Sequence, residues 1–333
     1  MFQFTIIKDS LRWKHAVEKF QHLDVYYSYE YGNSFAKVEH GELYGIYGEK
    51  GNTKLFYSFI KRRISLLGWE NYYDIVTPYG YGGPYIEGND ESILLDFDGV
   101  FERFCQENNI LTETIRFHPF VQNVEYTKRR MDVQFIRQTT AVDLTKPLEE
   151  IREEYTVMNK RNIKKAKREG LHCYVAKPTK ENIHTFMQLY EETMNRNHAS
   201  SFYYFQKDFF EEQLKETALS SSYLLFTEYK GKVIAAVLVI IGKKYAHYHL
   251  GASKTTCLHL KPNNLLFDYM IAFCKEKGAS LLHLGGGYNG DDGLFRFKES
   301  FTNQNFYDYF IGKKIYNEAI YEKMARALKK NYV

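Results

Sequence analysis

The stretch SSYLLFTEYKGKVIAAVLVII at residues 221–241, followed by KYAHYHLGAS at 244–253, decides the fold. Its first part contains two apolar runs separated by Tyr229-Lys230-Gly231, a turn signal that predicts a β-hairpin. The apolar run Val233–Ile241 is far too short to span a membrane and is typical of a buried strand. The second part alternates in polarity and predicts another strand, so three consecutive strands open this half of the chain.

The residues after these strands predict a loop, a helix and a closing strand. The loop KTTCLHLKPN at 254–263 leads into a helix over Asn264–Lys277, and Gly278 supplies the usual glycine at its end. SLLHLGGG at 280–287 then predicts the last strand. The predicted order is therefore hairpin, strand, loop, helix, strand.

The first half of the chain repeats this order about 170 residues earlier. It contains a hairpin at 41–60, a strand at 72–78, the glycine-rich loop YGYGGP at 79–84, a helix over Ser92–Asn109 and a strand at 112–121. The two copies share the pattern and little residue identity. We therefore expect two domains, residues 1–140 and 141–333, with a long polar helix at 143–170 leading into the second. The C-terminal helix Glu318–Lys330 is expected to cap the second domain.

Composition indicates an ordinary globular protein. The chain has 333 residues, 44% of them hydrophobic and 26% charged, which suits two domains. A net charge of +4 does not indicate a general nucleic-acid binder, and the four cysteines form no CxxC pair. Because the N-terminal residues lack the pattern of a signal peptide, we expect a cytoplasmic location without an integral membrane segment.

Several motifs, taken in order, resemble those of the FemABX family of non-ribosomal peptidyltransferases and of related acyltransferases. The motifs are TPYGYGGPYIEG at 77–88, IRFHPF at 115–120, NKRNIKKAKREGL at 159–171, HYHLGAS at 247–253, KPNNLL at 261–266 and HLGGG at 283–287 followed by FRFKESF. The resemblance implies an α/β fold with mixed α+β sheets, arranged as two tandem GNAT-like acyltransferase domains. It also implies that the second domain carries the chemistry.

The resemblance further implies the reaction and its substrates. An aminoacyl group would pass from aminoacyl-tRNA to an amine of a nucleotide-linked or lipid-linked peptidoglycan precursor. No resident cofactor and no metal are expected, since the donor is a co-substrate. One alternative is an acyl-CoA-dependent N- or O-acyltransferase acting on a glycan or small amine, although KTTCLHLKPN lacks the glycine-rich pyrophosphate loop of such enzymes. Another is a non-catalytic module that binds a nucleotide-sugar or RNA, and the oligomeric state is left open.

The candidate catalytic residues are Lys298, Phe297 and Tyr248. The resemblance places the Phe-Lys pair at the centre of the second domain, with Tyr248 lining the wedge between its strands. A lysine held there neutralises a phosphate or the oxyanion that forms when an amine attacks an acyl carbon. The alternative is an exposed lysine that follows a core phenylalanine.

A cluster of basic residues lies within nine positions of the polar helix: Lys160, Arg161, Lys164, Lys165, Lys167 and Arg168. Four of them, at positions 161, 164, 165 and 168, have the spacing of one helix face. Such a face could bind tRNA or a nucleotide-sugar diphosphate, and we select Arg161 and Lys164 as substrate-binding candidates. A merely solvated face is an equally good interpretation.

In the first half, Lys37, Tyr81, Gly82 and Gly83 are candidate contacts to the acceptor, although a purely structural turn explains the glycines as well. His247 and His249 have the spacing of one strand face, and we favour a structural role over metal binding.

The segment GGGYNG at 285–290 matches GxGxxG, but no helix start follows it directly, so we interpret it as the turn that presents Lys298. The sequence identifies no dedicated general base, and either Asp291, Asp292 or a substrate group could accept the proton.

Overall fold

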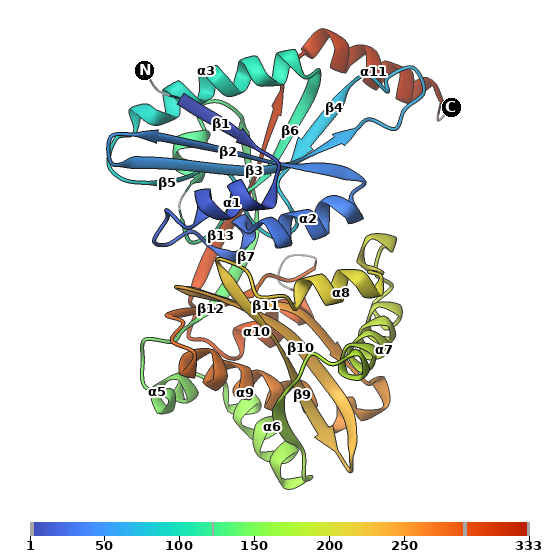
Figure 1. The fold of residues 1–333 in the computed structure, drawn as a ribbon. Helices are drawn as coiled ribbons and strands as arrows, with labels where there is room; N and C mark the ends of the chain where they lie inside the picture. Colours follow the sequence, from blue (N-terminus) through green and yellow to red (C-terminus); the bar gives the residue numbers. More distant parts are fainter. Residues whose placement is uncertain (1–2, 122, 289–291, 332–333) are drawn as a thin grey trace. The chain divides into compact units, whose positions relative to one another are not determined.

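The computed structural model describes residues 3–121, 123–288 and 292–331 (Figure 1). The chain divides into two compact units. Unit 1 comprises Met1–Ile136 together with Asp308–Val333, and unit 2 comprises Arg137–Tyr307. The confirmed fold class is α/β with mixed sheets, and the predicted order of hairpin, strand, helix and strand is present in both halves.

Unit 1 is a sheet with helices packed on it. Its strands are β1 (Gln3–Ile7), β2 (Gly41–Lys50), β3 (Thr53–Arg63), β4 (Tyr73–Val76), β5 (Tyr85–Glu87), β6 (Ile110–Arg116) and β13 (Phe306–Ile315). Its helices are α1 (Ser10–Val17), α2 (Tyr29–Val38), α3 (Ser92–Glu107), α4 (Val124–Thr127) and α11 (Glu318–Asn331), with a 3₁₀ turn η1 at Val25–Tyr27. The strand order is β1-β2-β3-β4-β6-β13, with β5 beside β3.

Unit 2 is also a sheet with helices packed on it, and its strand order is β7-β12-β11-β10-β9-β8. Its strands are β7 (Asp132–Asp143, beginning in unit 1), β8 (His172–Ala176), β9 (Ser220–Tyr229), β10 (Lys232–Gly242), β11 (Tyr245–Ser253) and β12 (Leu281–Gly285). Its helices are α5 (Leu148–Glu153), α6 (Val157–Arg168), α7 (Lys180–Arg196), α8 (Lys207–Gln213), α9 (Pro262–Glu276) and α10 (Gly293–Glu299), with 3₁₀ turns η2 (Ser201–Tyr203) and η3 (Thr255–Leu260). As predicted, β10 is almost continuously buried.

The structure differs from the sequence-based expectations at two places. The polar helix expected over 143–170 is two helices, because Thr156 is extended (ψ 152°) and its side chain caps the start of α6. The last strand and α11 fall in unit 1 instead of the second domain, because β13 pairs with β6 from Ile311 to Ile315.

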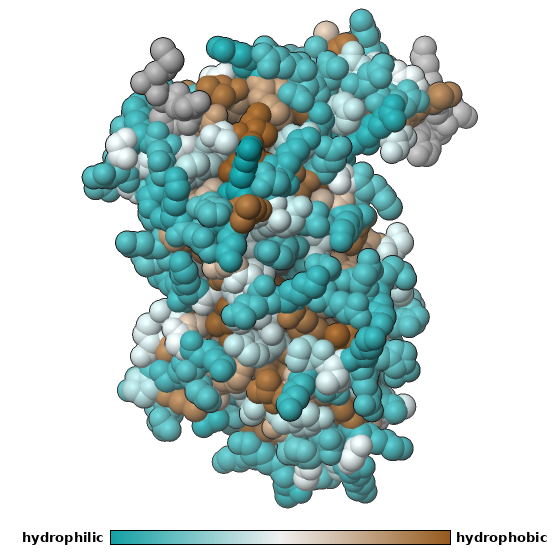
Figure 2. All heavy atoms as spheres, in the orientation of Figure 1, coloured by the Kyte–Doolittle hydropathy of each residue, from teal (hydrophilic) through white to brown (hydrophobic). Residues whose placement is uncertain are grey.

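Hydrophilic side chains cover most of the visible surface of the molecule (Figure 2). Among the described residues, no helix combines the length and the apolar composition that crossing a membrane requires.

A buried ion pair fixes the core of unit 1. The Glu113 carboxylate on β6 accepts hydrogen bonds from Arg130 (3.0 Å), from the Tyr57 hydroxyl (2.8 Å) and from the Tyr316 hydroxyl (2.8 Å). The Arg130 guanidinium also lies over the stacked rings of Phe97 and Phe101. Every charge in this network therefore has a partner, which makes its burial tolerable.

Removing one partner of this pair is expected to be costly. Arg130→Met leaves the Glu113 charge buried without its counter-ion and should lower the free energy of unfolding by about 3–5 kcal/mol. The double variant Arg130→Met/Glu113→Gln has no buried charge at position 113, so its free energy of unfolding should return most of the way to that of the parent. The exposed pair of Lys128 with Glu125 supplies the control, since Lys128→Met should change stability by less than about 0.5 kcal/mol in urea titrations. Equal losses in the single and double variants would contradict this account.

Candidate active site

The site begins where two parallel strands of unit 2 separate. Strands β11 and β12 pair only from Tyr245 to His247, opposite Leu281 to His283. Beyond that point β11 contains a bulge, since Tyr248 pairs with Val239 and Leu250 pairs with Leu238. A bulge bends its strand and redirects the neighbouring side chains. The carboxyl ends of β11 and β12 therefore diverge, in the manner of an acyltransferase wedge.

Helix α10 follows β12 and carries the Phe297-Lys298 pair. Asp292 caps its first turn, because one carboxylate oxygen accepts from the backbone N–H groups of Leu294 (3.0 Å) and Phe295 (2.9 Å). The other oxygen accepts from the backbone N–H of Tyr288 (2.6 Å), which links the cap to the preceding turn. The Asp292 carboxylate is thus engaged in holding the helix, which makes it a poor proton acceptor.

Phe297 orients the helix by packing against the core. Its ring makes edge contacts with Phe267 on α9 (4.9 Å between centroids) and with Phe301 (5.4 Å). Because successive helical residues point in different directions, this packing directs the next side chain, Lys298, toward β12. Phe297 is therefore a positioning residue in this structure.

Lys298 is the unusual member of the site, because its side chain is only 6% exposed. Its Nζ donates to the backbone carbonyl of Gly286 (2.7 Å) and lies 5.3 Å from the ring centre of Tyr248. Burial, helped by the nearby charge of Arg137, lowers the pKa of Lys298 to about 7, although Asp292 acts in the opposite direction. The ammonium and the neutral amine are therefore both accessible near neutral pH.

The turn that receives Lys298 depends on glycine. Gly285 has φ +78°, and a Cβ there would lie 3.3 Å from the Lys298 Nζ. A Cβ on Gly286 would lie 2.9 Å from both the Cδ of Arg137 and the backbone oxygen of Gln138. Arg137 in turn donates to the backbone carbonyls of Gly287 and Tyr288. Close packing on both sides therefore fixes the carbonyl that binds the ammonium.

Tyr248 forms the other wall of the Lys298 environment. Its half-buried ring tilts against Phe267 at 4.9 Å between centroids, and a Cβ at Gly251 would lie 2.0 Å from its hydroxyl oxygen. Burial raises the pKa of Tyr248 to about 12, so the hydroxyl remains protonated at neutral pH. Tyr248 can thus donate a hydrogen bond and offer its ring face to a cation.

Two buried asparagines support α10 through a chain of hydrogen bonds. Asn264 on α9 donates to Asn159 on α6 (2.9 Å), and Asn159 donates to the backbone carbonyl of Ser300 (3.1 Å). The same carbonyl accepts from the backbone N–H of Thr156 (3.0 Å). These bonds tie the end of α10 to two other helices, which restricts the position of Lys298.

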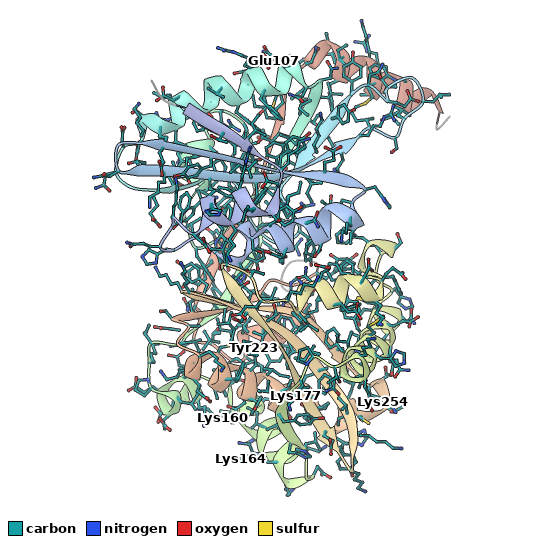
Figure 3. The ribbon with its side chains drawn as sticks, viewed as in Figure 1. Glu107, Lys160, Lys164, Lys177, Tyr223 and Lys254 are labelled. Atoms are coloured by element: carbon teal, nitrogen blue, oxygen red, sulfur yellow. The ribbon has the colours of Figure 1, made fainter. Side chains whose placement is uncertain are left out.

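The basic residues selected on α6 lie away from its buried face. Arg161 and Lys164 are exposed, whereas Asn159, Ile163 and Ala166 pack inward. Lys160 and Lys164 both lie on α6 (Figure 3), and Lys160 donates to the backbone carbonyl of Glu153 (2.7 Å). Within the described ranges, neither Arg161 nor Lys164 makes an ion pair with a carboxylate, so their charges are available to a ligand.

In unit 1 the selected glycines belong to a tightly bonded turn. The Gly82 N–H donates to the Arg116 carbonyl (2.7 Å), and the Gly82 carbonyl accepts from the Asn123 side chain (2.7 Å). Gly83 has φ +95°, and a Cβ there would lie 2.8 Å from the Asn123 Nδ2. These contacts explain both glycines structurally.

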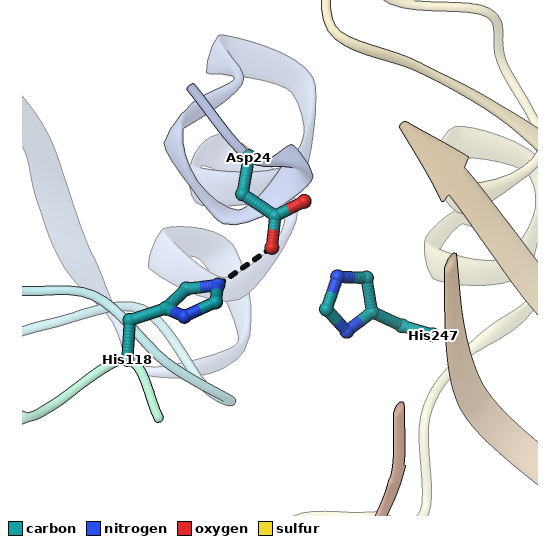
Figure 4. A group of neighbouring side chains, drawn as sticks. All are labelled: Asp24, His118 and His247. Carbon is teal, nitrogen blue, oxygen red and sulfur yellow. Dashed lines mark hydrogen bonds and ion pairs between the residues drawn. The ribbon is translucent and has the colours of Figure 1, made fainter. Parts of the chain in front are cut away.

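Tyr81 and Lys37 occupy different environments in unit 1. Tyr81 is half-buried and makes ring contacts with Tyr26, Tyr309 and His118, whereas Lys37 is exposed in the last turn of α2. His118 itself is bonded to the carboxylate of Asp24 at 2.6 Å (Figure 4). Its other ring nitrogen accepts from the Phe120 N–H (3.1 Å), so both nitrogens of His118 have partners.

His249 and Asp291 are the remaining polar candidates. His249 is the extra residue of the β11 bulge, so the strict strand alternation with His247 is broken. Burial, followed by the proximity of His247, lowers the pKa of His249 to about 3, which keeps its imidazole neutral. Asp291 lies outside the described residues.

Sequence reasoning missed the residues that support Lys298, namely Arg137, Asn159, Asn264 and the Gly286 carbonyl. Asn159, Asn264 and the three consecutive glycines at 285–287 lie within the quoted motifs, but only the glycines indicate a constrained turn. The other contacts join residues more than 100 positions apart and follow from the tertiary fold.

Comparisons with known proteins agree with this geometry. A family model described as an acetyltransferase (GNAT) domain matches residues 158–299, which include β11, α9 and α10. No curated protein matches the chain.

Several solved structures are similar along nearly the whole chain. FemX is 13% identical, and the match covers 96% of this chain and 99% of FemX with a TM-score of 0.72. The C-terminal domain of a putative lysylphosphatidylglycerol synthetase from Agrobacterium fabrum is 15% identical, with 97% and 96% coverage and a TM-score of 0.59. A tandem GNAT protein from the clavulanic acid biosynthesis pathway is 8% identical, with 95% and 99% coverage and a TM-score of 0.52.

The resemblance to FemABX proteins is therefore confirmed at the level of the fold. The chain is an acyltransferase that contains a GNAT domain, and its fold is that of tandem GNAT proteins.

The lowered pKa of Lys298 predicts a pH-dependent stability effect. Between pH 7 and about 10.5 the unfolded chain holds the Lys298 proton while the folded chain releases it, so the unfolded state binds more protons and stability rises with pH. Burying the ammonium therefore costs stability most strongly below pH 7. Lys298→Met should raise the free energy of unfolding at pH 6 by roughly a few kcal/mol, and the gain should shrink toward pH 10.

Denaturant titrations at pH 6, 8 and 10 measure this effect, with Lys277→Met as the control because Lys277 is exposed at the end of α9. A Lys298→Met variant that is less stable than the parent at pH 6 would contradict the predicted cost of burial.

Proposed function

We propose that this acyltransferase transfers an aminoacyl group from aminoacyl-tRNA to an amine of a peptidoglycan precursor. The observation that carries the proposal is the buried Lys298 ammonium, held by the Gly286 carbonyl and faced by the Tyr248 ring at the diverging ends of β11 and β12. Within the described residues Lys298 makes no ion pair with a carboxylate, and burying an unpaired ammonium reduces stability, which supports a role for this lysine in chemistry.

In this reaction the amine attacks the ester carbonyl of the donor, a C–N bond forms and the C–O bond to the terminal ribose breaks. Negative charge develops on the carbonyl oxygen during the attack and then on the leaving ribose oxygen, which takes up a proton. Lys298 would stabilise these charges through its ammonium, and Tyr248 would donate a hydrogen bond from its protonated hydroxyl. The enzyme also contributes by orienting the two substrates.

The loop before α9 favours an aminoacyl-tRNA donor over acyl-CoA. A diphosphate at a helix start is bound by free backbone N–H groups. Here the Thr255 N–H donates to the Glu192 carboxylate (2.7 Å), and this bond lowers the pKa of Glu192. Pro262, the first residue of α9, has no N–H, and Lys261 before it is in the left-handed region at φ 63°. Two positions of this loop therefore lack a backbone N–H for a diphosphate, since that of Thr255 binds a carboxylate and Pro262 has none.

The exposed cations of α6 support a polyanionic donor. Arg161 and Lys164 point to solvent from a helix whose buried face anchors Asn159, and Asn159 supports α10. Contacts between basic side chains and phosphates position a nucleic acid without reading its sequence. We therefore assign Arg161 and Lys164 to the tRNA. The resemblance to FemABX proteins alone suggests Lys37, Tyr81, Gly82 and Gly83 as contacts to the acceptor.

Loss of the Lys298 charge should abolish most of the activity. Lys298→Ala is expected to lower kcat by about 10²–10³-fold, the usual effect of removing one group that stabilises an oxyanion. In the parent enzyme, kcat should fall as pH rises through the pKa of Lys298, because only the ammonium stabilises negative charge. Single-turnover transfer from labelled aminoacyl-tRNA to nucleotide-linked and lipid-linked muropeptides measures both effects, with Lys277→Ala as the control. Unchanged turnover in a folded Lys298→Ala enzyme would remove the central residue from the mechanism.

The choice of donor is tested separately. Charged tRNA should support transfer and raise the melting temperature, whereas acetyl-CoA should do neither, because the Thr255 N–H is occupied and Pro262 lacks one. Uncharged tRNA distinguishes binding of the nucleic acid from recognition of the ester. Product formation from acetyl-CoA alone would favour the acyl-CoA-dependent alternative.

A further inference from the structure

The connection between β3 and β4 in unit 1 presents an apolar apex to solvent. The four residues Leu66-Leu67-Gly68-Trp69 form a turn in which the Trp69 N–H donates to the Leu66 carbonyl (2.9 Å). Gly68 has φ +85°, the value that a type II turn requires at its third position, and this places Leu67 at the second. The Leu67 side chain is 92% exposed.

This apex is ordered by further hydrogen bonds. The Ile64 N–H donates to the Tyr72 carbonyl (3.0 Å), and the Gly68 N–H donates to the Glu70 carboxylate (3.1 Å). Trp69 contacts the ring of Tyr72 and remains partly exposed. The turn therefore fixes Leu67 in solvent and leaves Trp69 partly exposed beside it.

Helix α11 begins at the same end of the strands as the apex, and we call this end the edge of unit 1. Arg62 on β3 pairs with Asp74 on β4, Asp74 pairs with Thr112 on β6, and Thr112 pairs with Ile315 on β13. These four residues form one row across the sheet. The apex begins just after the β3 end of the row, and α11 begins just after its β13 end.

Helix α11 is amphipathic and lies on the surface. Its larger apolar residues, Ile320, Tyr321, Met324 and Leu328, recur at helical spacing, and polar residues separate them. None of its described side chains, residues 318–328, is buried. Hydrophobic spheres lie among hydrophilic ones over this helix (Figure 2). Its apolar face is thus only partly covered by packing within unit 1.

The charges at this edge favour an anionic partner. Within the described residues these charges nearly balance, because Glu39 and Asp74 pair with Arg62, Glu322 pairs with Arg326, and Arg63 lies beside Glu70 and donates to its backbone carbonyl. Lys323 is an exposed cation. The excess of positive charge comes from the sequence of residues 318–333, which contains four basic and two acidic residues.

We propose that this edge of unit 1 docks on the surface of an anionic phospholipid bilayer. Leu67 and Trp69 enter the interfacial region, and α11 lies along the surface with its cations toward the headgroups. Leucine, tryptophan and basic residues on an amphipathic helix suit a bilayer interface. The inference concerns binding alone and stands independently of the acyl-transfer chemistry.

The intrinsic tryptophan fluorescence of the chain can test this proposal. It has two tryptophans, and Trp13 is fully buried, with its indole N–H bonded to the Tyr27 carbonyl. A change in tryptophan emission on adding vesicles therefore reports Trp69. Vesicles containing phosphatidylglycerol should shift the emission of the full chain to shorter wavelength and co-sediment with it, less so at high salt. Pure phosphatidylcholine vesicles should bind weakly, and Trp69→Phe should remove the shift.

Paired variants separate docking from loss of structure. Leu67→Glu should weaken binding to the anionic vesicles by about ten-fold or more without changing the melting temperature, because the side chain is exposed. Leu95→Glu is the matched control, since Leu95 is 76% exposed in the first turn of α3, near Lys50 at the opposite edge of the sheet. The proposal is overturned if the anionic vesicles do not bind, or if Leu67→Glu binds as the parent does. It is also overturned if Leu67 instead mediates self-association without lipid in sedimentation velocity.

Discussion

One buried ammonium, that of Lys298, sets the main constraint on unit 2. A buried cation beside the ring of Tyr248 needs a fixed acceptor, and the carbonyl of Gly286 supplies it. That carbonyl is held by close packing of the turn against Arg137, and the helix that carries the lysine is held by its Asp292 cap. Much of the local architecture thus serves to keep one charge in place.

The two units use buried charge in different ways. In unit 1 the Arg130 guanidinium has carboxylate partners in Glu113 and Asp98, so its charge is compensated and its role is structural. In the described part of unit 2, Lys298 has no carboxylate within ion-pair distance, and burial lowers its pKa. This difference is the reason why we propose a functional role for Lys298 and a structural one for Arg130.

The sequence predicted the parts of the structure that depend on local patterns. Hairpins, helices and their order followed from apolar spacing and from glycine turns, and the ordered motifs led to Lys298 and Tyr248 as candidates, whose catalytic role stays a prediction. Contacts between distant segments could not be predicted in this way. The chain of hydrogen bonds Asn264–Asn159–Ser300 joins residues from three helices, and the pairing of β13 with β6 returns the end of the chain to unit 1. The break at Thr156 was missed because a single capping residue interrupts an otherwise continuous polar pattern.

The most direct test of the account is the pKa of Lys298 in the folded enzyme. NMR titration of lysine side chains labelled with ¹³C and ¹⁵N, assigned by comparison with Lys298→Met, measures this value without reference to activity. The structure predicts one lysine that titrates near pH 7, well below the others. A Lys298 signal that titrates near its usual value of 10.5 would show that the ammonium is solvated, and the proposed charge stabilisation at the diverging strands would lose its basis.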